Sequence, residues 1–196
     1  MPGASRTKQI LAASLKDLMH TMPLEKISVS DIVEHADIGR NTFYYHFQDK
    51  FDLVNWIFQT ESTRFFAENA LRKNWTNALE SIEDYLRENK DFYCNALAYN
   101  GQNSLQGYLF DTISDLVVQQ VHSMEGAEYR SLSREELRFI GDFIASAIVG
   151  LVVRWAAQGM KDDPARYQNC IRRICDGSLI RAYIGQVEKP AAEDEN

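Results

Sequence analysis

Proline is nearly absent from this chain of 196 residues: it occurs four times, and none lies between Leu24 and Asp163. A proline inside a helix or a sheet removes a backbone hydrogen bond, so this gap leaves 140 consecutive residues that can form regular structure. Residues that favour helices, such as Leu, Ala, Glu, Arg and Gln, are frequent throughout the chain. The composition therefore predicts an all-α protein.

Cysteine is also scarce, and the three that occur, at positions 94, 170 and 175, are irregularly spaced. They are too few for a disulfide framework or a tetrahedral zinc site, and we interpret them as buried, reduced thiols. The HExxH, GxGxxG, GxSxG and P-loop motifs are missing, and no Cys/His or carboxylate pair stands out from solvated helix charges. We therefore expect no metal, no cofactor and no enzyme activity.

Long apolar runs are missing as well. The longest candidate, residues 143–153, is shorter than the roughly 18 uncharged residues that a membrane span requires. The first residues also lack the apolar segment of a signal peptide. We therefore expect a cytoplasmic protein that does not enter a membrane.

Negative charge is unevenly placed along the chain, whose net charge is -7. Residues 1–50 contain six basic and six acidic side chains, whereas residues 51–196 contain 15 and 22. Nucleic acid responds to the local field where the contact is made. The acidic total therefore does not exclude nucleic acid as a partner of the neutral N-terminal quarter.

Helical periodicity indicates a small module at the N-terminus. A first helix is predicted over residues 5–21, with Ser5 as its N-cap. Ser28 and Asp31 predict a capping box that begins a second, short helix. Residues 37–39 separate it from a third helix over residues 40–46. Two short helices joined by a three-residue turn, after a longer helix, are typical of a helix-turn-helix module.

The rest of the chain predicts a larger bundle of helices, with capping signals at Asn74, Ser104, Ser133 and Asp163-Pro164. The last two helices are expected over residues 133–159 and 164–185. The domains that we predict are residues 1–50 for the helix-turn-helix module, 51–187 for the helical bundle and 188–196 for a disordered acidic tail.

The third predicted helix contains the stretch GRNTFYYHF, with four aromatic residues in five positions. At about 100° per residue, Phe43 and Phe47 point the same way and predict a buried face. Asn41, Thr42 and Tyr45 lie on the opposite face, which a seven-residue helix in so small a module cannot also bury. We therefore expect these three side chains to face outward.

The outward side chains have the chemistry of DNA contacts. Arg40 can pair with guanine, Asn41 with adenine, and Thr42 with a base edge or a thymine methyl group. The hydroxyl groups of Tyr44 and Tyr45 can reach phosphate oxygens. Further phosphate contacts are predicted for three side chains at the starts of neighbouring helices, Ser28, Ser30 and Lys50.

Residues 5 to about 58 resemble the DNA-binding module of the TetR family of bacterial transcriptional regulators. The segments that carry the resemblance are Ile27 to Ile32, Ala36 to Ile38, Thr42 to Phe47, and Asp49-Lys50 with Leu53. The resemblance implies that the third helix enters the major groove of double-stranded DNA, with Arg40, Asn41, Thr42 and Tyr45 nearest the bases. It also implies that the DNA backbone is held by Tyr44, His46, Lys50 and the start of the second helix.

The chain departs from this family at two positions. Asp37 stands where the family often has glycine, so the turn relies on an aspartate in an unusual backbone conformation. Gly39 stands where the family often has serine or threonine, so the third helix lacks a side-chain cap. We expect a slightly softer turn and an unchanged mode of binding.

The resemblance also implies a homodimer, in which the last two long helices form a four-helix bundle with the partner. The helix over residues 133–159 has two apolar faces, and the pattern does not decide which one meets the partner. One face contains Leu137, Ile140, Ile144, Ile148, Leu151 and Trp155. The opposite face, our candidate dimer interface, contains Phe143, Ala147, Gly150 and Arg154.

The body is expected to respond to a small-molecule effector or a partner protein, neither of which the sequence identifies. Candidate lining residues of an effector pocket are the aromatic residues Phe65, Tyr85, Phe92, Tyr93, Tyr99, Tyr108 and Phe110. Ordinary core packing is the alternative for each of them, because pockets in helical bundles are lined by the same residue types as cores.

Residues 27–32 and 52–58 most resemble a subgroup that includes regulators of dihydroxyacetone kinase operons. We predict a sequence-specific DNA-binding transcriptional regulator that binds a near-palindromic operator as a dimer. Whether it represses or activates is left open. The alternative is a helical protein-interaction module that uses the Tyr45 face without reading DNA, and the salt dependence of DNA binding separates the two.

Overall fold

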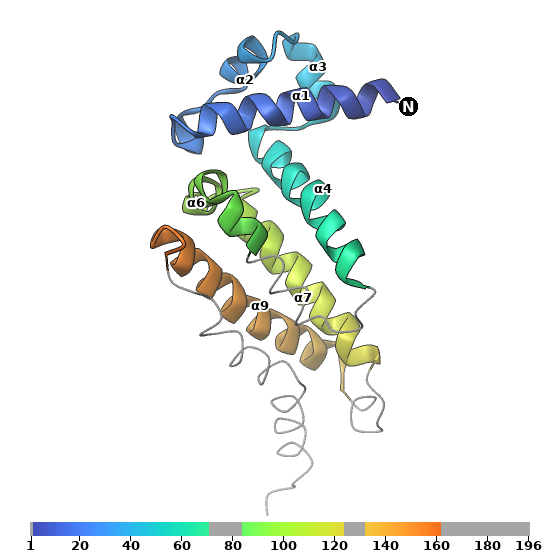
Figure 1. The fold of residues 1–196 in the computed structure, drawn as a ribbon. Coiled ribbons are helices and arrows are strands. Elements are labelled where there is room, and N and C mark those ends of the chain that lie inside the picture. Colours follow the sequence, from blue (N-terminus) through green and yellow to red (C-terminus); the bar gives the residue numbers. More distant parts are fainter. Residues whose placement is uncertain (1, 71–83, 124–131, 162–196) are drawn as a thin grey trace, which may run out of the picture. The chain divides into compact units, whose positions relative to one another are not determined.

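The computed structural model describes residues 2–70, 84–123 and 132–161 (Figure 1). Every regular element in these ranges is a helix, as predicted. In chain order they are α1 (Pro2–Met19), the 3-10 helix η1 (Leu24–Lys26), α2 (Val29–His35), α3 (Arg40–His46), α4 (Lys50–Ala70), α6 (Lys90–Ala98), α7 (Leu105–Ser123) and α9 (Arg134–Ala157). The predicted helix over residues 164–185 and the predicted tail over residues 188–196 lie outside the described residues.

The chain divides into two compact units, residues 1–109 with 149–162 and residues 110–148 with 163–196. Of the described elements, α1, η1, α2, α3, α4 and α6 therefore belong to the first unit, while α7 and α9 each contribute residues to both. Our boundary at residue 50 separates a DNA-reading module from the rest by function, and it stays a prediction.

An apolar core joins α1, α2 and α3, with α2 packed against both α1 and α3 (Figure 1). Leu11 and Leu15, one turn apart on α1, are fully buried together with Ile32 of α2 and Phe43 of α3. Leu53 of α4 is also fully buried. Each such side chain contributes about 1.5 to 3 kcal/mol when it leaves water. The helix-turn-helix module is therefore an apolar unit continuous with the start of α4.

The ends of the short helices confirm the predicted capping. Ser28 N–H donates to Asp31 Oδ2 over 2.7 Å, and Asp31 N–H donates to Ser28 Oγ over 3.2 Å, which completes the capping box of α2. Asp37 has a φ of 51°, the left-handed conformation that the turn requires. No side chain caps α3 at Gly39. The first helix differs from the prediction, because it begins at Pro2 rather than after Ser5; proline suits the first position of a helix.

In the second unit, α7 and α9 approach each other closely at Gly141. A Cβ atom at this position would lie 2.7 Å from Ser114 Oγ and 2.9 Å from the Ser114 carbonyl oxygen, so only glycine fits. Ser114 Oγ donates to Asp142 Oδ1 over 2.7 Å. Arg138 forms ion pairs with Asp115 at 2.9 Å and Asp142 at 3.1 Å. Close backbone contact and a polar cluster thus hold this helix pair together.

Candidate nucleic-acid interface

Helix α3 has one buried face and one exposed face, as its sequence predicts. Phe43 is fully buried, and Phe47, the C-cap residue, is 3% exposed. On the other side Tyr45 is 82% exposed, and Tyr44 at the flank is 52% exposed. The large aromatic residues of α3 therefore divide between the core and the solvent.

The exposed face of α3 also carries Arg40, Asn41 and Thr42, which are all exposed. Together with Tyr45 they present a guanidinium group, an amide and two hydroxyl groups on one short helix. The His46 ring packs edge-on against the Tyr45 ring, with the centroids 4.9 Å apart. Hydrogen-bonding groups of this kind can pair with base edges and phosphate oxygens. This surface, formed by residues 40–42 and 45, is named the reading face below.

The first helix supports α3 through a contact that the sequence does not reveal. Lys8 Nζ lies 5.0 Å from the centroid of the Phe47 ring and 5.5 Å from that of the Trp56 ring. The Phe47 and Trp56 rings also pack against each other at 5.7 Å. The three residues are far apart in the chain, so no local spacing predicts the contact. A cation above two aromatic rings helps to fix the end of α3.

Helix α2 is fixed to α1 by a buried hydrogen bond. Ser14 Oγ donates to the Ile32 carbonyl oxygen over 2.7 Å. Because its one hydroxyl proton is used there, the contact of 3.2 Å between Ser14 Oγ and His35 Nδ1 requires His35 to donate. Ser28 and Ser30, both predicted to contact phosphate, lie at the start of α2. The Ser28 hydroxyl donates to Asp31 over 2.8 Å, and Ser30 is half-buried. Their contact with phosphate stays a prediction.

The Lys50 side chain has a structural role that sequence reasoning missed. Its ammonium group donates to the carbonyl oxygens of Leu24, Glu25 and Ile27 over 2.7, 2.9 and 2.6 Å. An ammonium group has three N–H donors, so all of them are used. Burial lowers the pKa of Lys50, and nearby carboxylates, Glu25 first, oppose this shift. The phosphate contact predicted for Lys50 is untested, and this geometry leaves no donor for it.

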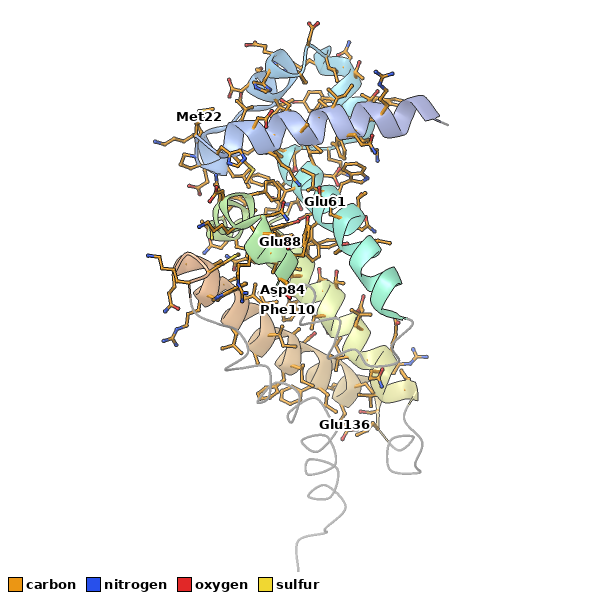
Figure 2. The ribbon with its side chains drawn as sticks, in the orientation of Figure 1. Met22, Glu61, Asp84, Glu88, Phe110 and Glu136 are labelled. Carbon is orange, nitrogen blue, oxygen red and sulfur yellow. The ribbon has the colours of Figure 1, made fainter. Side chains whose placement is uncertain are left out.

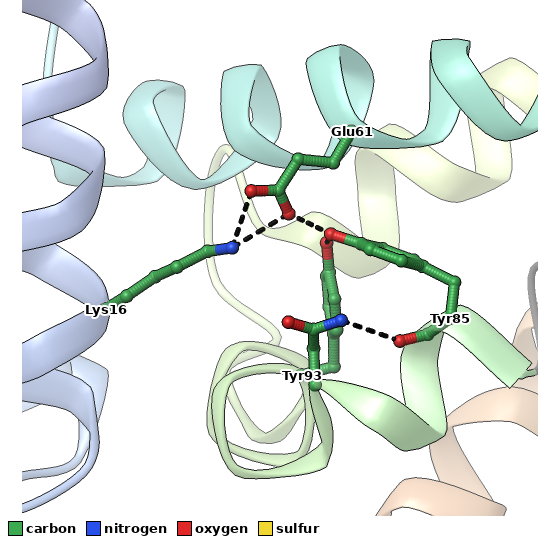
Figure 3. Close-up of polar contacts among 5 residues, drawn as sticks. Lys16, Glu61, Tyr85 and Tyr93 are labelled. Atoms are coloured by element: carbon green, nitrogen blue, oxygen red, sulfur yellow. Dashed lines mark hydrogen bonds and ion pairs between the residues drawn. The ribbon is translucent and has the colours of Figure 1, made fainter.

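A polar network contains two of the aromatic candidates for an effector pocket, Tyr85 and Tyr93 (Figure 3). Lys16 Nζ of α1 contacts both carboxylate oxygens of Glu61 at 2.6 and 2.8 Å. The Tyr85 hydroxyl donates to Glu61, and the Tyr93 hydroxyl lies 2.8 Å from that of Tyr85. Tyr93 is fully buried, and burial raises its pKa, with a further contribution from the Glu61 charge. These hydroxyl groups are satisfied within the protein.

Three of the other aromatic candidates each pack against a second aromatic ring. Phe92 packs on Tyr93 with centroids 4.9 Å apart, Tyr99 stacks on Phe51 at 4.2 Å, and Tyr108 meets Phe58 at 6.2 Å. Phe110 is half-buried, and the Phe65 side chain lies outside the described residues. The structure thus gives most of this set a packing role, and an effector pocket lined by them stays a prediction.

A shallow hollow of about 250 Å³ lies in the second unit. It is lined by Asp115, Val118, His122, Arg134, Leu137 and Arg138. None of the predicted pocket residues borders it, and the side chain of Arg138 is already paired with Asp115.

Within the part of the chain that the structure describes, no group of three or more His, Cys, Asp or Glu side chains is placed to hold a metal ion.

The structure separates the two apolar faces of α9. The face with Leu137, Ile140, Ile144 and Ile148 is buried, with each side chain at most 7% exposed. On the opposite face Phe139 and Phe143 are each 59% exposed, and their rings stack with centroids 6.3 Å apart. The remaining candidate interface residues, Ala147, Gly150 and Arg154, are exposed as well, and so is Leu151 from the other predicted stripe. The exposed surface around Phe139, Phe143, Ala147 and Gly150 is named the outer α9 face.

By length and composition α9 is apolar enough to cross a membrane, with a mean hydropathy of 1.7. The core helix of a soluble protein passes the same test, so one such helix is weak evidence for a membrane span.

The α9 helix begins with a capping box, in which Ser133 N–H donates to Glu136 Oε2 over 2.8 Å (Glu136 is labelled in Figure 2). Hydrogen bonds from Ser133 lower the pKa of Glu136.

Two protein families match the chain. Residues 10–57 match the family described as bacterial regulatory proteins, tetR family, and residues 73–177 match the family described as transcriptional regulator C-terminal region. A similar curated protein is the HTH-type dhaKLM operon transcriptional activator DhaS of Lactococcus lactis subsp. lactis, which is 40% identical over 87 residues. These residues are 44% of this chain and 46% of that protein, so the match spans about half of the relative.

Two solved structures have the same fold over most of their length. The dihydroxyacetone kinase operon activator DhaS gives a TM-score of 0.61 with 26% identity, covering 89% of this chain and 97% of that one. NalD, the secondary repressor of the MexAB-OprM multidrug efflux pump in Pseudomonas aeruginosa, gives a TM-score of 0.54 with 15% identity, over 88% and 96%. The latter shows the fold alone. The similar proteins are transcriptional regulators, and this chain belongs to the TetR family of DNA-binding bacterial regulators.

Proposed function

We propose that the chain binds a near-palindromic operator as a homodimer, with the reading face of α3 in the major groove. The observation that supports this most directly is the 82% exposure of Tyr45 opposite the fully buried Phe43. A protein core explains the inward ring, whereas the outward hydroxyl, amide and guanidinium groups have no partner role inside the module. Arg40, Asn41, Thr42 and Tyr45 face the bases, and Tyr44 and His46 lie toward the DNA backbone.

A second copy of the chain is the proposed partner of the outer α9 face. Phe139 and Phe143 expose stacked apolar rings, and Ala147 and Gly150 let another helix come close. Exposed apolar patches of this kind mark interaction sites in soluble proteins. Pairing through this face accounts for the apolar character of α9 without a membrane, and it is consistent with the cytoplasmic location that we propose.

The regulatory role that we propose is activation of an operon, as the printed name of DhaS states for that relative. The support is the identity of 40% over part of the chain and the likeness over nearly all of it. A ligand or a partner protein acting on the helical body would modulate this role. Deleting the gene in the source bacterium should lower the transcripts of genes next to the operator, whereas a repressor would raise them.

The DNA-binding proposal is tested by selecting bound sequences from a random library of duplexes. Arg40→Ala should then weaken binding to the selected operator by about 1 to 3 kcal/mol and relax the preference at one base pair. The affinity of the parent protein should fall steeply with salt, since phosphate contacts release counterions. Recovery of no preferred sequence, with weak and sequence-independent binding, would favour a protein-interaction module that uses the same face.

A further inference from the structure

Helix η1, which connects α1 to α2, is held at both ends by side chains of other helices. At its start, Leu24 N–H donates to Asn95 Oδ1 of α6 over 2.7 Å. From its first residue to its C-cap, the carbonyl oxygens of Leu24, Glu25 and Ile27 accept from Lys50 at the start of α4. A three-residue 3-10 helix has few hydrogen bonds of its own. Its position is therefore set by Asn95 and Lys50.

The Asn95 side chain also caps the end of α1. Its Nδ2 group donates to the Met19 carbonyl oxygen over 3.0 Å and to the Met22 carbonyl oxygen over 2.8 Å. The last carbonyl groups of a helix have no partner within the helix, so they need one from elsewhere. Figure 2 shows Met22 at this turn. One amide of α6 therefore fixes both the end of α1 and the start of η1.

The loop after α6 holds the start of α4 in a similar way. Asn103 Nδ2 donates to Asp49 Oδ2 over 3.0 Å, and Asn55 Nδ2 donates to the Asn103 carbonyl oxygen over 3.1 Å. The other carboxylate oxygen of Asp49 accepts from the Phe51 N–H over 2.8 Å and so caps α4. The Tyr99 ring stacks on Phe51 with only 7° between the planes. The loop is thus fixed to α4 beside Lys50.

These contacts close a ring within the first unit. The ring runs from Asn95 through η1 to Lys50, from the adjacent Asp49 to Asn103, and back to Asn95 along residues 95–103. It joins the end of α1 to the start of α4, in addition to the contacts that Lys8 and Lys16 of α1 make with Trp56 and Glu61 of α4. Segment 95–103 therefore connects the end of α1 with the start of α4, and these two points flank the module that carries the reading face.

We propose that Asn95 and Asn103 are specificity-determining residues, which fix the orientation of the helix-turn-helix module and so the spacing of operator half-sites that a dimer accepts. The inference rests on the proposed function, because it requires two modules on one operator. One inserted base pair moves a half-site by about 3.4 Å and rotates it by about 34° around the DNA axis. Two modules held rigidly cannot follow such a change, whereas two loosened modules can.

Two variants open the ring at different points, and a third serves as a matched control. Asn95→Ala removes the three hydrogen bonds at α1 and η1. Asn103→Gly removes the side chain alone, because Asn103 has a φ of 59°, which glycine adopts without strain. The control is Gln106→Ala, since Gln106 Nε2 donates to the Leu97 carbonyl oxygen over 2.7 Å within segment 95–103, a bond that links this segment to neither α1, η1 nor α4. It removes the same kind of bond beside the same loop.

The measurement is the affinity of each protein for the selected operator and for versions with one base pair added or removed at its centre. The parent and Gln106→Ala should bind operators of altered spacing at least about tenfold more weakly than the selected operator, because the base contacts of one half-site are lost. Asn95→Ala and Asn103→Gly should bind all spacings within about threefold of one another. Thermal unfolding of each variant shows whether it is folded. If Asn95→Ala does not fold, the spacing discrimination of Asn103→Gly alone tests the proposal.

Unchanged spacing discrimination in folded ring variants would overturn the inference, and so would a parent protein that binds every spacing equally well. Failure of the proposed function looks different. In that case the parent would not prefer the selected operator over random duplexes at any spacing, before any variant is compared.

Discussion

Helices α3 and α9 each bury one face and expose another, but their exposed faces differ in chemistry. On α3 the exposed aromatic residues are both tyrosines, Tyr44 at 52% and Tyr45 at 82% exposed, accompanied by an amide and a hydroxyl from Asn41 and Thr42. On α9 the exposed aromatic residues are Phe139 and Phe143, each 59% exposed, accompanied by Ala147 and Gly150. The first surface can exchange hydrogen bonds with water for hydrogen bonds with a partner, and the second cannot.

This difference indicates two kinds of partner. A tyrosine keeps its hydroxyl hydrated until a polar group replaces the water, which suits the phosphates and base edges of DNA. Exposed phenylalanine rings gain from contact with another apolar surface, at about 25 cal/mol per Å² removed from water. Helix α3 has seven residues and α9 has 24. In the function that we propose, a short helix that reads few base pairs benefits from a long helix that pairs two copies of it.

The strongest test of the comparison is the buried side of α3. Phe43→Ala should lower the free energy of unfolding by about 3 to 5 kcal/mol, because the ring is fully buried and its loss leaves a cavity. Urea denaturation measures the change. Tyr45→Ala is the matched variant: stability should change by less than about 0.5 kcal/mol, while operator affinity falls. Equal destabilisation by both variants would mean that Tyr45 is a core residue after all.

The next test concerns the outer α9 face. Phe143→Glu should weaken dimerisation by about 2 to 4 kcal/mol, because a charge in the centre of an apolar interface cannot be solvated there. Sedimentation velocity over a range of concentrations measures the change. Leu116→Glu, at an exposed position of α7 that is 49% exposed, is the control and should leave the dimer intact. A dimer that survives Phe143→Glu but dissociates with Leu116→Glu would place the interface on α7.

Lys50 belongs to neither exposed face, and its replacement separates structure from DNA contact. Lys50→Met should cost about 1.5 to 3 kcal/mol of stability, because an ammonium group that serves three carbonyl oxygens is lost. The salt dependence of operator binding should not change. Lys26→Met, at an exposed lysine of η1, controls for the loss of one positive charge. A slope of log affinity against log salt that decreases by about 0.9 with Lys50→Met alone would restore its phosphate contact.

The case of Lys50 shows where prediction from sequence stops. Capping boxes, the left-handed Asp37 and the two faces of α3 depend on residues a few positions apart, so the sequence predicted them and the structure confirms them. The partners of Lys50 lie 23 to 26 residues away, and those of Asn95 lie 71 to 76 residues away. From the sequence alone, the ammonium group of a lysine near a helix start is equally suited to bind a phosphate or a backbone carbonyl oxygen. Only the packed helices decide between them.

The aromatic set shows the same limit for the body. The sequence supplies residue types that suit a pocket or a core, and it does not tell which side chains meet. In the structure, Tyr85 and Tyr93 share a network with Glu61 and Lys16, contacts that join α1, α4 and α6 (Figure 3). Conversely, burial alone distinguishes the two faces of α9, and the partner of the exposed face stays a proposal. One face is at most 7% exposed at Leu137, Ile140, Ile144 and Ile148.

The smallest expected effect concerns the beginnings of the two helices. Helix α9 begins with the Ser133 capping box, whereas α3 begins at Gly39 without a side-chain cap. Gly39 has a φ of -68°, which any residue adopts, and a Cβ atom there would meet only Thr42 Oγ1 at 3.8 Å. Gly39→Ser should therefore raise stability by about 0.5 to 1 kcal/mol, through a new cap and a less flexible unfolded chain. Gly39→Ala isolates the second contribution.

Operator affinity then reports whether DNA orders the reading face. In the structure the first turn of α3 is already closed, since Thr42 N–H donates to the Gly39 carbonyl oxygen over 2.9 Å, and Phe43 fixes the helix to the core. We therefore expect Gly39→Ser to stabilise the protein while operator affinity stays within about twofold. If affinity instead rises by the full factor that the stability gain implies, α3 is incompletely formed in free protein. In that case the uncapped start of α3, unlike the capped start of α9, would be completed by the DNA.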